Sequence, residues 1–186
     1  MCNRRIATTV VAVLLAGFVA AVFSQAESLP VSSTKPSADG AVQPAEYTYS
    51  HNFDNKVTLY ASRTADTLYL GVVGDTDGWV AVGLGSKKMD GDPIFIGFVD
   101  SDGKVNIKTQ MGKGHKLVDA SSDASASVIS SAMKQEGGKT DLKVALKASD
   151  FIKQGQSSLD VIFAIGKERN FTRYHSFRGS TTLALQ

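Results

Sequence analysis

Short segments with alternating apolar residues, separated by turn residues, run through most of this chain. In the segment 67–73 (TLYLGVV), Leu68, Leu70 and Val72 fall on one face, and the segment 140–146 alternates in the same way. Gly, Asp, Asn and Pro stand between the segments, and nothing after residue 38 shows the period of a long helix. This pattern predicts an all-β fold, an antiparallel immunoglobulin-like β-sandwich of about nine strands.

The expected strands follow the apolar runs, with the run from residue 126 the least regular of them. A first strand is entered at Glu46 and Tyr47 within the stretch 41–50, and the others are 56–61, 67–73, 79–84, 94–99, 105–108, 126–133, 140–146, 159–166 and 181–185. We expect a tight hairpin turn at 101–103 and a short helical turn at 148–153. The segments 110–114, rich in glycine, and 170–180, rich in aromatic and charged residues, are expected to be loops.

The N-terminal segment has the composition of an export signal. Residues 1–26 begin with Arg4 and Arg5, continue through the apolar run 6–23 and end on Ser-Gln-Ala, small residues of the kind found before a cleavage site. The alternative is an uncleaved anchor, which would be the protein's only membrane contact. Residues 27–38, rich in Ser and Pro, are expected to be a flexible tether, and 39–186 to be the folded domain. An exported protein of this kind is periplasmic or extracellular.

Charge and cysteine content exclude several classes of protein. The chain has 20 Lys plus Arg and 18 Asp plus Glu, and residues 1–26 hold two of the Arg and no acid. The remainder is therefore close to neutral, which gives no indication of nucleic-acid binding. Cys2 is the only cysteine, so residues 39–186 have no disulfide, thiolate metal site, iron–sulfur cluster or covalently attached c-type haem. Any cofactor is held non-covalently by His, Met or carboxylates.

A polar loop between two apolar runs holds the most informative residue. The stretch 78–100 (GWVAVGLGSKKMDGDPIFIGFVD) reads as a strand, a loop and a second strand, with Met89 in the loop. A lone Met is usually a packed side chain, and His175 in the loop 170–180 is by itself an ordinary hydrogen-bonded histidine. Taken separately, neither residue indicates a site.

Other chemistries have weaker support in the sequence. The motifs G-x-S-x-G, H-E-x-x-H and the Walker loop are absent. A zinc or copper site would need His51, His115 and His175 to converge, which their spacing does not favour. The four Asp residues at 90, 92, 100 and 102 raise the alternative of calcium, although acidic turns between strands are more often solvated connections.

Taken together and in order, the motifs of residues 39–185 resemble the DOMON family of sandwich domains. The resembling motifs are D-G-A-V at 39–42, E-Y at 46–47, T-L-Y-L-G at 67–71, G-W-V-A-V-G-L-G at 78–85, Met89 before I-G-F-V-D at 96–100, F-A-I-G at 163–166 and F-T-x-Y-H-S-x-R-G-S at 171–180. The resemblance implies a sandwich whose haem-binding branch, which includes the cytochrome domain of cellobiose dehydrogenase, holds one b-type haem between a Met and a His. Carried over by position, these axial ligands are Met89 and His175.

The resemblance further implies one-electron transfer with a separate redox partner protein and no catalytic site of its own, since both axial positions are filled. Other branches lack haem, and the alternative is a binding module for carbohydrate or another small ligand. An exported zinc or copper enzyme is the least supported reading. His115 is the rival of His175 as a ligand.

Side chains near the two ligand positions are the remaining candidates. Five aromatic residues are expected either to line the haem pocket or to belong to the core: Trp79, Phe95, Phe171, Tyr174 and Phe177. Four cations are expected either to pair with the haem propionates or to be ordinary surface charge: Lys87, Lys88, Arg173 and Arg178.

Overall fold

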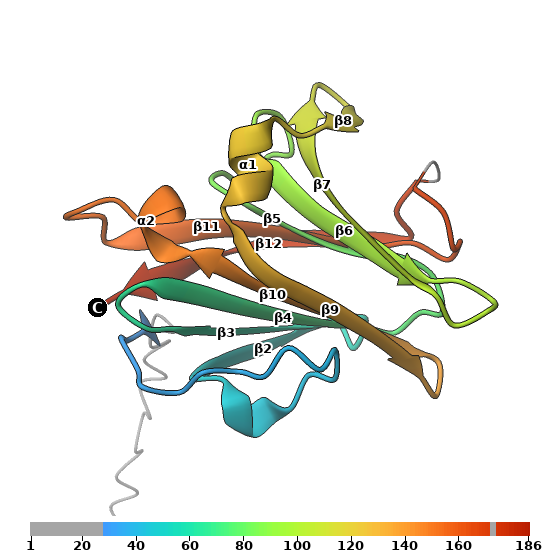
Figure 1. The fold of residues 1–186 in the computed structure, drawn as a ribbon, viewed down its shortest axis with the longest axis horizontal. Coiled ribbons are helices and arrows are strands. Elements are labelled where there is room, and N and C mark those ends of the chain that lie inside the picture. The colour runs from blue at the N-terminus through green and yellow to red at the C-terminus, as the bar shows by residue number, and fades with distance from the viewer. Residues whose placement is uncertain (1–27, 172–173) are drawn as a thin grey trace, which may run out of the picture.

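Two β-sheets lie face to face in the computed structural model, which describes residues 28–171 and 174–186 (Figure 1). One sheet has seven strands in the order β1-β12-β11-β5-β6-β7-β8, and the other has five in the order β2-β3-β4-β10-β9. Every neighbouring pair is antiparallel except β1 and β12. The predicted antiparallel sandwich is confirmed, because alternating short segments bury one face of each sheet against the other.

The strands and helical turns have the following bounds. The seven-stranded sheet contains β1 (Ser28–Leu29), β5 (Val80–Leu84), β6 (Pro93–Val99), β7 (Val105–Lys113), β8 (Lys116–Asp119), β11 (Ser158–Ile165) and β12 (Phe177–Leu185). The five-stranded sheet contains β2 (Tyr49–Phe53), β3 (Val57–Arg63), β4 (Thr67–Gly74), β9 (Val128–Glu136) and β10 (Lys139–Lys147). The helical turns are η1 (Pro44–Glu46), α1 (Ser122–Ala126) and α2 (Ala148–Phe151).

Twelve strands rather than about nine are formed in the part of the chain that the structure describes. The first strand, expected to be entered at Glu46 and Tyr47, begins at Tyr49, because Pro44 opens η1 and the side chains of Gln43 and Glu46 cap that turn. The predicted loop 110–114 is mostly strand, because β7 continues to Lys113 by pairing with β8, which the sequence analysis missed. Likewise β12 begins at Phe177 and not at residue 181.

The predicted tether at 27–38 is corrected in its first part. Leu29 is fully buried in the main core, and β1 pairs in parallel with the end of β12. Arg63 reinforces this arrangement, since its Nε donates to the carbonyl oxygen of Leu29 at 2.9 Å and its own carbonyl accepts from Ser32 N at 2.8 Å. A parallel partner 156 positions away in the chain leaves no local pattern, so composition alone pointed to a tether.

The expected signal at 1–26 lies outside the described residues. Among the residues described, no helix is both long and apolar enough to cross a membrane.

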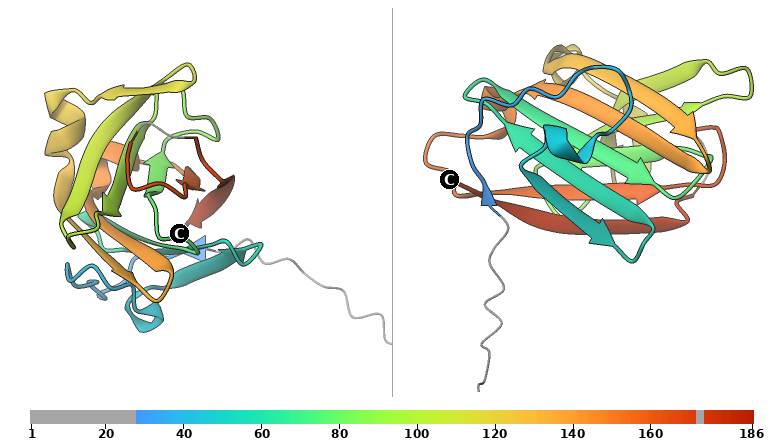
Figure 2. Two further views of the ribbon diagram at one scale, coloured as in Figure 1. Left: turned by 90° about the vertical axis from the view of Figure 1, so that its right-hand side faces the viewer. Right: turned by 90° about the horizontal axis from the view of Figure 1, so that it is seen from below.

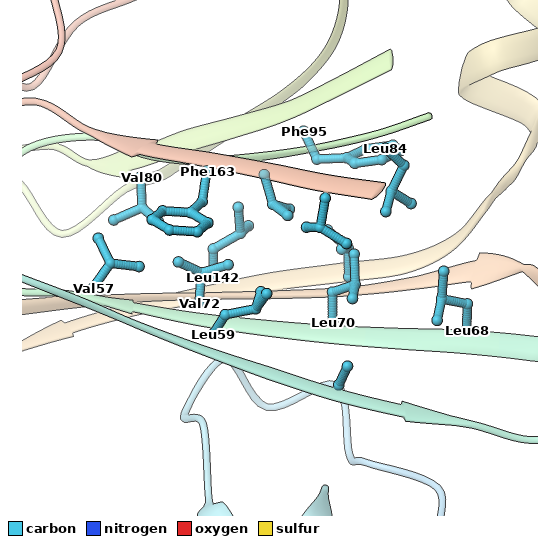
Figure 3. Close-up of a cluster of buried hydrophobic side chains, with 14 of the residues drawn as sticks. Val57, Leu59, Leu68, Leu70, Val72, Val80, Leu84, Phe95, Leu142 and Phe163 are labelled. Carbon is cyan, nitrogen blue, oxygen red and sulfur yellow. The ribbon is translucent and has the colours of Figure 1, made fainter. Parts of the chain in front are cut away.

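The main core fills the space between the two sheets (Figure 3). Alternate residues of each strand point into it, as Leu68, Leu70 and Val72 of β4 do. Phe163 of β11 reaches across to Phe53 of β2, with ring centroids 4.3 Å apart. This packing fixes the register of every long strand, because a shift by one residue would turn its apolar side chains outward.

A buried lysine holds the segment before β2 against the outer face of the five-stranded sheet. Lys143 of β10 is 4% exposed, and its Nζ donates to Asp39 Oδ1 at 3.0 Å, Glu46 Oε2 at 2.7 Å and the carbonyl oxygen of Ala41 at 2.9 Å. The hydrogen bond from Lys143 holds the pKa of Asp39 below its ordinary value. Burial raises the pKa of Glu46, but the bonds from Lys143 and Ser37 outweigh it and the net shift is also downward.

Replacing Lys143 with Met is expected to reduce the pH dependence of stability in acid. Carboxylates with lowered pKa values contribute stability that is present above their ordinary pKa and is lost as the pH falls through the lowered, folded-state value. The variant should therefore be less stable than the parent above about pH 5, and the difference should shrink below about pH 4. Urea unfolding at pH 7 and pH 3 measures this. A difference that stays constant across that range would contradict the assignment.

Candidate functional site on the outer face of the seven-stranded sheet

A second apolar cluster lies on the face of the seven-stranded sheet that points away from the sandwich interior. Its buried members are Trp79, Ala81, Ile94, Ile96 and Phe98, and Met89, Leu117, Ile162, Ala164 and Phe171 pack against them partly buried. An outer sheet face is usually polar, with apolar residues confined to the core side. An apolar outer face that is nevertheless buried must be covered, and here the cover consists of loops.

The strand register gives this face its layout. Arg178, Ala164, Ala81, Ile96 and Lys108 are paired in turn across β12, β11, β5, β6 and β7. Side chains of directly paired residues project from the same face of a sheet. The middle of this row is therefore apolar, with short side chains at Ala81 and Ala164, and a cation stands at each end. We call this apolar surface the floor of the site.

Two loops lie over this floor, on the side of the sheet that faces away from the five-stranded sheet (Figure 2). One is the green loop 85–92 between β5 and β6, which carries Met89, and the other is the red segment that leads from β11 to β12. Both contribute apolar side chains to the cluster, since Met89 and Phe171 pack against it. The loops thus bring residues 82 positions apart in the chain to one surface.

Backbone contacts with β7 fix the position of the Met89 loop. Gly91 N donates to the carbonyl oxygen of Gly112 at 3.0 Å, and Gly112 N donates to the carbonyl oxygen of Asp92 at 2.9 Å. A Cβ atom at Gly112 would stand 1.7 Å from the carbonyl oxygen of Met89. Only glycine at 112 therefore allows the loop to approach this closely.

Carboxylates also organise this loop. Asp92 is 5% exposed and accepts hydrogen bonds from Ser86 N at 3.0 Å and from Ser86 Oγ at 3.1 Å. Burial raises the pKa of Asp92 despite these two bonds. Asp90 Oδ1 accepts from Gly114 N at 2.6 Å, which attaches the loop to the turn between β7 and β8.

The predicted calcium and three-histidine alternatives gain no support from this geometry. Asp100 accepts from the backbone N atoms of Asp102 and Lys104, so it shapes the hairpin between β6 and β7. His51 lies on β2, whereas His115 lies in the turn between β7 and β8. Within residues 28–171 and 174–186, no three His, Cys, Asp or Glu side chains are grouped closely enough to hold a metal ion.

Two buried polar atoms on this face have no hydrogen-bond partner among the described residues. One is Nε1 of Trp79, whose ring lies over Gly166 so closely that a Cβ there would stand 2.1 Å from it. The other is Oε1 of Gln110, which is paired with Ile94 in the register and therefore faces the same side. An unpaired buried donor is costly, and a ligand that accepts a hydrogen bond from Trp79 would relieve that cost.

The second loop is held to the sheet by aromatic contacts. Phe171 packs on Phe98 of β6, with ring centroids 4.8 Å apart. Nζ of Lys108, on the neighbouring strand β7, lies 4.8 Å from the centroid of the Phe171 ring. Where the loop ends, Ser176 N donates to the carbonyl oxygen of Ile165 at 2.7 Å. Between these two anchors His175 and Tyr174 are exposed, Tyr174 to 90%.

The structure brings some of the predicted pocket residues together and separates others. Trp79 and Phe171 belong to the outer cluster, whereas Phe95 and Phe177 pack in the main core inside the sandwich, which confirms the core role expected as the alternative for these two. The difference is parity, because odd and even positions of a strand face opposite sides.

The charged candidates occupy the surroundings of the cluster. Lys87 and Lys88 are exposed on the Met89 loop, and Arg178 is exposed on β12. Arg173 lies outside the described residues.

Sequence reasoning missed Phe98, Lys108, Gln110 and Gly112. The only local signal was that the run 94–99 is apolar at nearly every position, which indicates a strand covered on both faces.

Comparisons with known proteins agree with this architecture. The model of the DOMON domain family matches residues 51–166, more than half of the chain and including Met89 but not His175. A search of curated proteins finds no significant match.

Three solved structures share the fold. The cytochrome b domain of pyranose dehydrogenase from Coprinopsis cinerea has 11% identity and a TM-score of 0.53, over 73% of this chain and 80% of that one. The cytochrome domain of Myriococcum thermophilum cellobiose dehydrogenase has 11% identity and a TM-score of 0.50, over 74% and 81%. A family 9 carbohydrate-binding module from Caldicellulosiruptor kristjanssonii, solved in complex with glucose, has 11% identity and a TM-score of 0.51, over 86% and 96%. On the family match, this chain belongs to the DOMON domain family.

Proposed function

We propose that this protein binds one non-covalent b-type haem on the outer face of the seven-stranded sheet, with Met89 and His175 as axial ligands, and transfers single electrons. The observation that carries the proposal is the outer apolar cluster, which is covered by the loop holding Met89 and contains the unpaired Nε1 of Trp79. The shared fold with two cytochrome domains supports the same reading, although a fold by itself does not determine function.

The residues on this face suit a flat, largely apolar cofactor with two carboxylates. The floor at Ala81 and Ala164 has short side chains, and Trp79 and Phe171 supply apolar walls. The Trp79 N–H is a donor for a carboxylate, and exposed Lys88 and Arg178 are candidates for further pairing with it.

The donor set defines the chemistry that the haem would supply when bound. The Met89 thioether and the His175 imidazole would hold the haem, and a haem held by these two groups would supply one-electron transfer. The aromatic residues of the cluster keep water away from the sheet. Met89 is positioned by the backbone of β7, and His175 by the anchors on both sides of it.

We further propose that the chain is exported to the periplasm or the cell exterior by its N-terminal segment, and that a separate redox protein supplies or receives the electron. The basic start and apolar run of residues 1–26 support export. Secretion of the full chain with loss of its first 26 residues, read by N-terminal sequencing, would test it.

An absorption spectrum tests the haem proposal directly. Full-length protein produced with haem available should show a sharp Soret band when oxidised and split low-spin bands after dithionite reduction. A featureless visible spectrum that persists after hemin is added would contradict the proposal.

A haem-free carbohydrate-binding module is the second candidate. Tyr174 is 90% exposed, and exposed aromatic rings are suited to stacking on sugars. The resemblance in fold to a carbohydrate-binding module supports this candidate to the same limited extent. Saturable glucose binding by calorimetry, lost in Tyr174→Ala, together with no haem uptake, would favour it over electron transfer.

A further inference from the structure

The turn between β4 and β5 joins the two sheets through hydrogen bonds at one threonine. Thr76 is 9% exposed, and its hydroxyl donates to the carbonyl oxygen of Gly166, just after β11, at 2.7 Å. The same hydroxyl accepts from Gly78 N at 3.0 Å. The carbonyl oxygen of Thr76 accepts from the hydroxyl of Thr140, a fully buried residue of β10, at 2.8 Å. Thr76 therefore links the five-stranded sheet to the segment that follows β11.

The backbone of this turn lies very close to that segment. A Cβ atom at Gly78 would stand 2.2 Å from the carbonyl oxygen of Gly166. Trp79 N donates to the carbonyl oxygen of Glu168 at 3.2 Å, and Gly166 N donates to the carbonyl oxygen of Trp79 at 2.9 Å. The turn and the segment are thus one hydrogen-bonded unit. We term this unit the junction, and its residues are 76–79 and 166–168.

Two groups of the candidate site depend on the junction. The ring of Trp79 lies over Gly166, and its unpaired Nε1 is the donor proposed above for a carboxylate of the haem. His175 lies further along the segment that Gly166 begins. Both hydrogen bonds of the Thr76 hydroxyl are buried. Their loss would leave two backbone groups unpaired away from water, which is costly, so the junction would move to pair them again.

We propose that Thr76 is a positioning residue of the haem site, because its hydroxyl sets where Trp79 and the segment that carries His175 lie over the outer face. This inference rests on the proposed function and deepens it by naming a residue that does not ligate the iron. The hydroxyl is occupied by two backbone groups of the junction, so it acts through them and not by contact with the haem. The hydrogen bond from Thr140 anchors the turn, so the site on one sheet is held in place from the other sheet.

Variants at Thr76 and a matched control test this proposal. Thr76→Val keeps the shape of the side chain but leaves the Gly166 carbonyl and Gly78 N unpaired, whereas Thr76→Ser keeps the hydroxyl. Thr76→Ala, which removes the hydroxyl without placing a methyl group near that carbonyl, replaces Thr76→Val if the latter does not fold. Ser127→Ala is the control, since Ser127 is 7% exposed and its hydroxyl donates to Asp150 Oδ2 at 2.6 Å, beside the opposite end of β10.

Tryptophan fluorescence provides a readout that does not need haem, because Trp79 is the only tryptophan of the chain. The emission of haem-free Thr76→Val should move to longer wavelength as water reaches the ring, and Thr76→Ser and Ser127→Ala should keep the parental emission. In a hemin titration, Thr76→Val should bind about tenfold more weakly than the parent, as the loss of a buried hydrogen bond implies. Thr76→Ser should restore the affinity to within about twofold, and Ser127→Ala should leave it unchanged.

The outcomes separate this inference from the proposed function. Parental emission and parental haem affinity in Thr76→Val would overturn the positioning role. An equal loss of affinity in Ser127→Ala would also overturn it, because the effect would then follow from general stability. If the parent takes up no haem but the emission of Thr76→Val alone shifts, the haem function fails and the positioning of Trp79 by Thr76 stands.

Discussion

Replacing Met89 with leucine is expected to remove one axial ligand while keeping the packing of the loop. Leucine has nearly the volume of methionine, so the outer cluster should stay filled. The thioether favours ferrous iron, and its loss should lower the midpoint potential by on the order of 0.1 V, within the roughly 0.8 V that axial ligands span. The low-spin bands of the reduced protein should give way to a five-coordinate, high-spin spectrum. Spectroelectrochemical titration measures both changes.

The histidine variants complete this test. His175→Ala should lose haem more readily than Met89→Leu, because imidazole is the stronger ligand of a b-type haem, and added imidazole should restore the low-spin spectrum. His115→Ala is the matched control, since His115 lies in the turn that Gly114 attaches to the Met89 loop. If His115→Ala loses the spectrum and His175→Ala keeps it, the ligand assignment is wrong and His115 takes that role.

Replacing Gly112 with alanine is expected to displace the Met89 loop from the sheet. The new Cβ would meet the Met89 carbonyl oxygen at 1.7 Å, and this neighbour is backbone, so a side-chain rotation cannot relieve the clash. Overpacking of this kind costs about 1–3 kcal/mol in the free energy of unfolding. The haem-free variant should therefore unfold at lower urea concentration, and the holoprotein should resemble Met89→Leu in spectrum.

A neighbouring substitution separates loop displacement from general damage to β7. Lys113→Ala alters an exposed residue of the same strand and should change stability by less than about 0.5 kcal/mol, with an unaltered spectrum. Should Gly112→Ala keep the parental spectrum and potential, the contact with β7 would not be what positions Met89.

Much of the sandwich could be predicted from local pattern. Leu68, Leu70 and Val72 alternate with half-exposed or small neighbours, and a period of two residues is visible without knowledge of any partner strand. The hairpin turn at 101–103 was predicted correctly for the same reason, because Asp102 and Gly103 mark it locally. The candidate ligands came from the order of motifs along the chain, and their ligation of haem stays a prediction.

What the sequence could not determine depends on partners far apart in the chain. The prediction of a tether was wrong at Leu29 because Leu29 pairs with Leu185 of β12. The prediction of a loop at 110–114 was wrong because this segment pairs with β8. Phe95 and Phe177 belong to the core and not to the candidate site because their side chains point to the inner side of the sheet. That side depends on where each strand begins and how it pairs.

By itself, the sequence determined the fold class and singled out Met89 and His175, since both follow from features that are local or ordered along the chain. Only the tertiary structure decided where they lie. Residues of five strands form the outer floor, two loops cover it, and Lys108 lies at its edge through a register that pairs it with Ile96. The physical reason is that burial of an outer sheet face depends on what lies over it, and loop contacts such as those of Gly112 are not encoded in any periodicity.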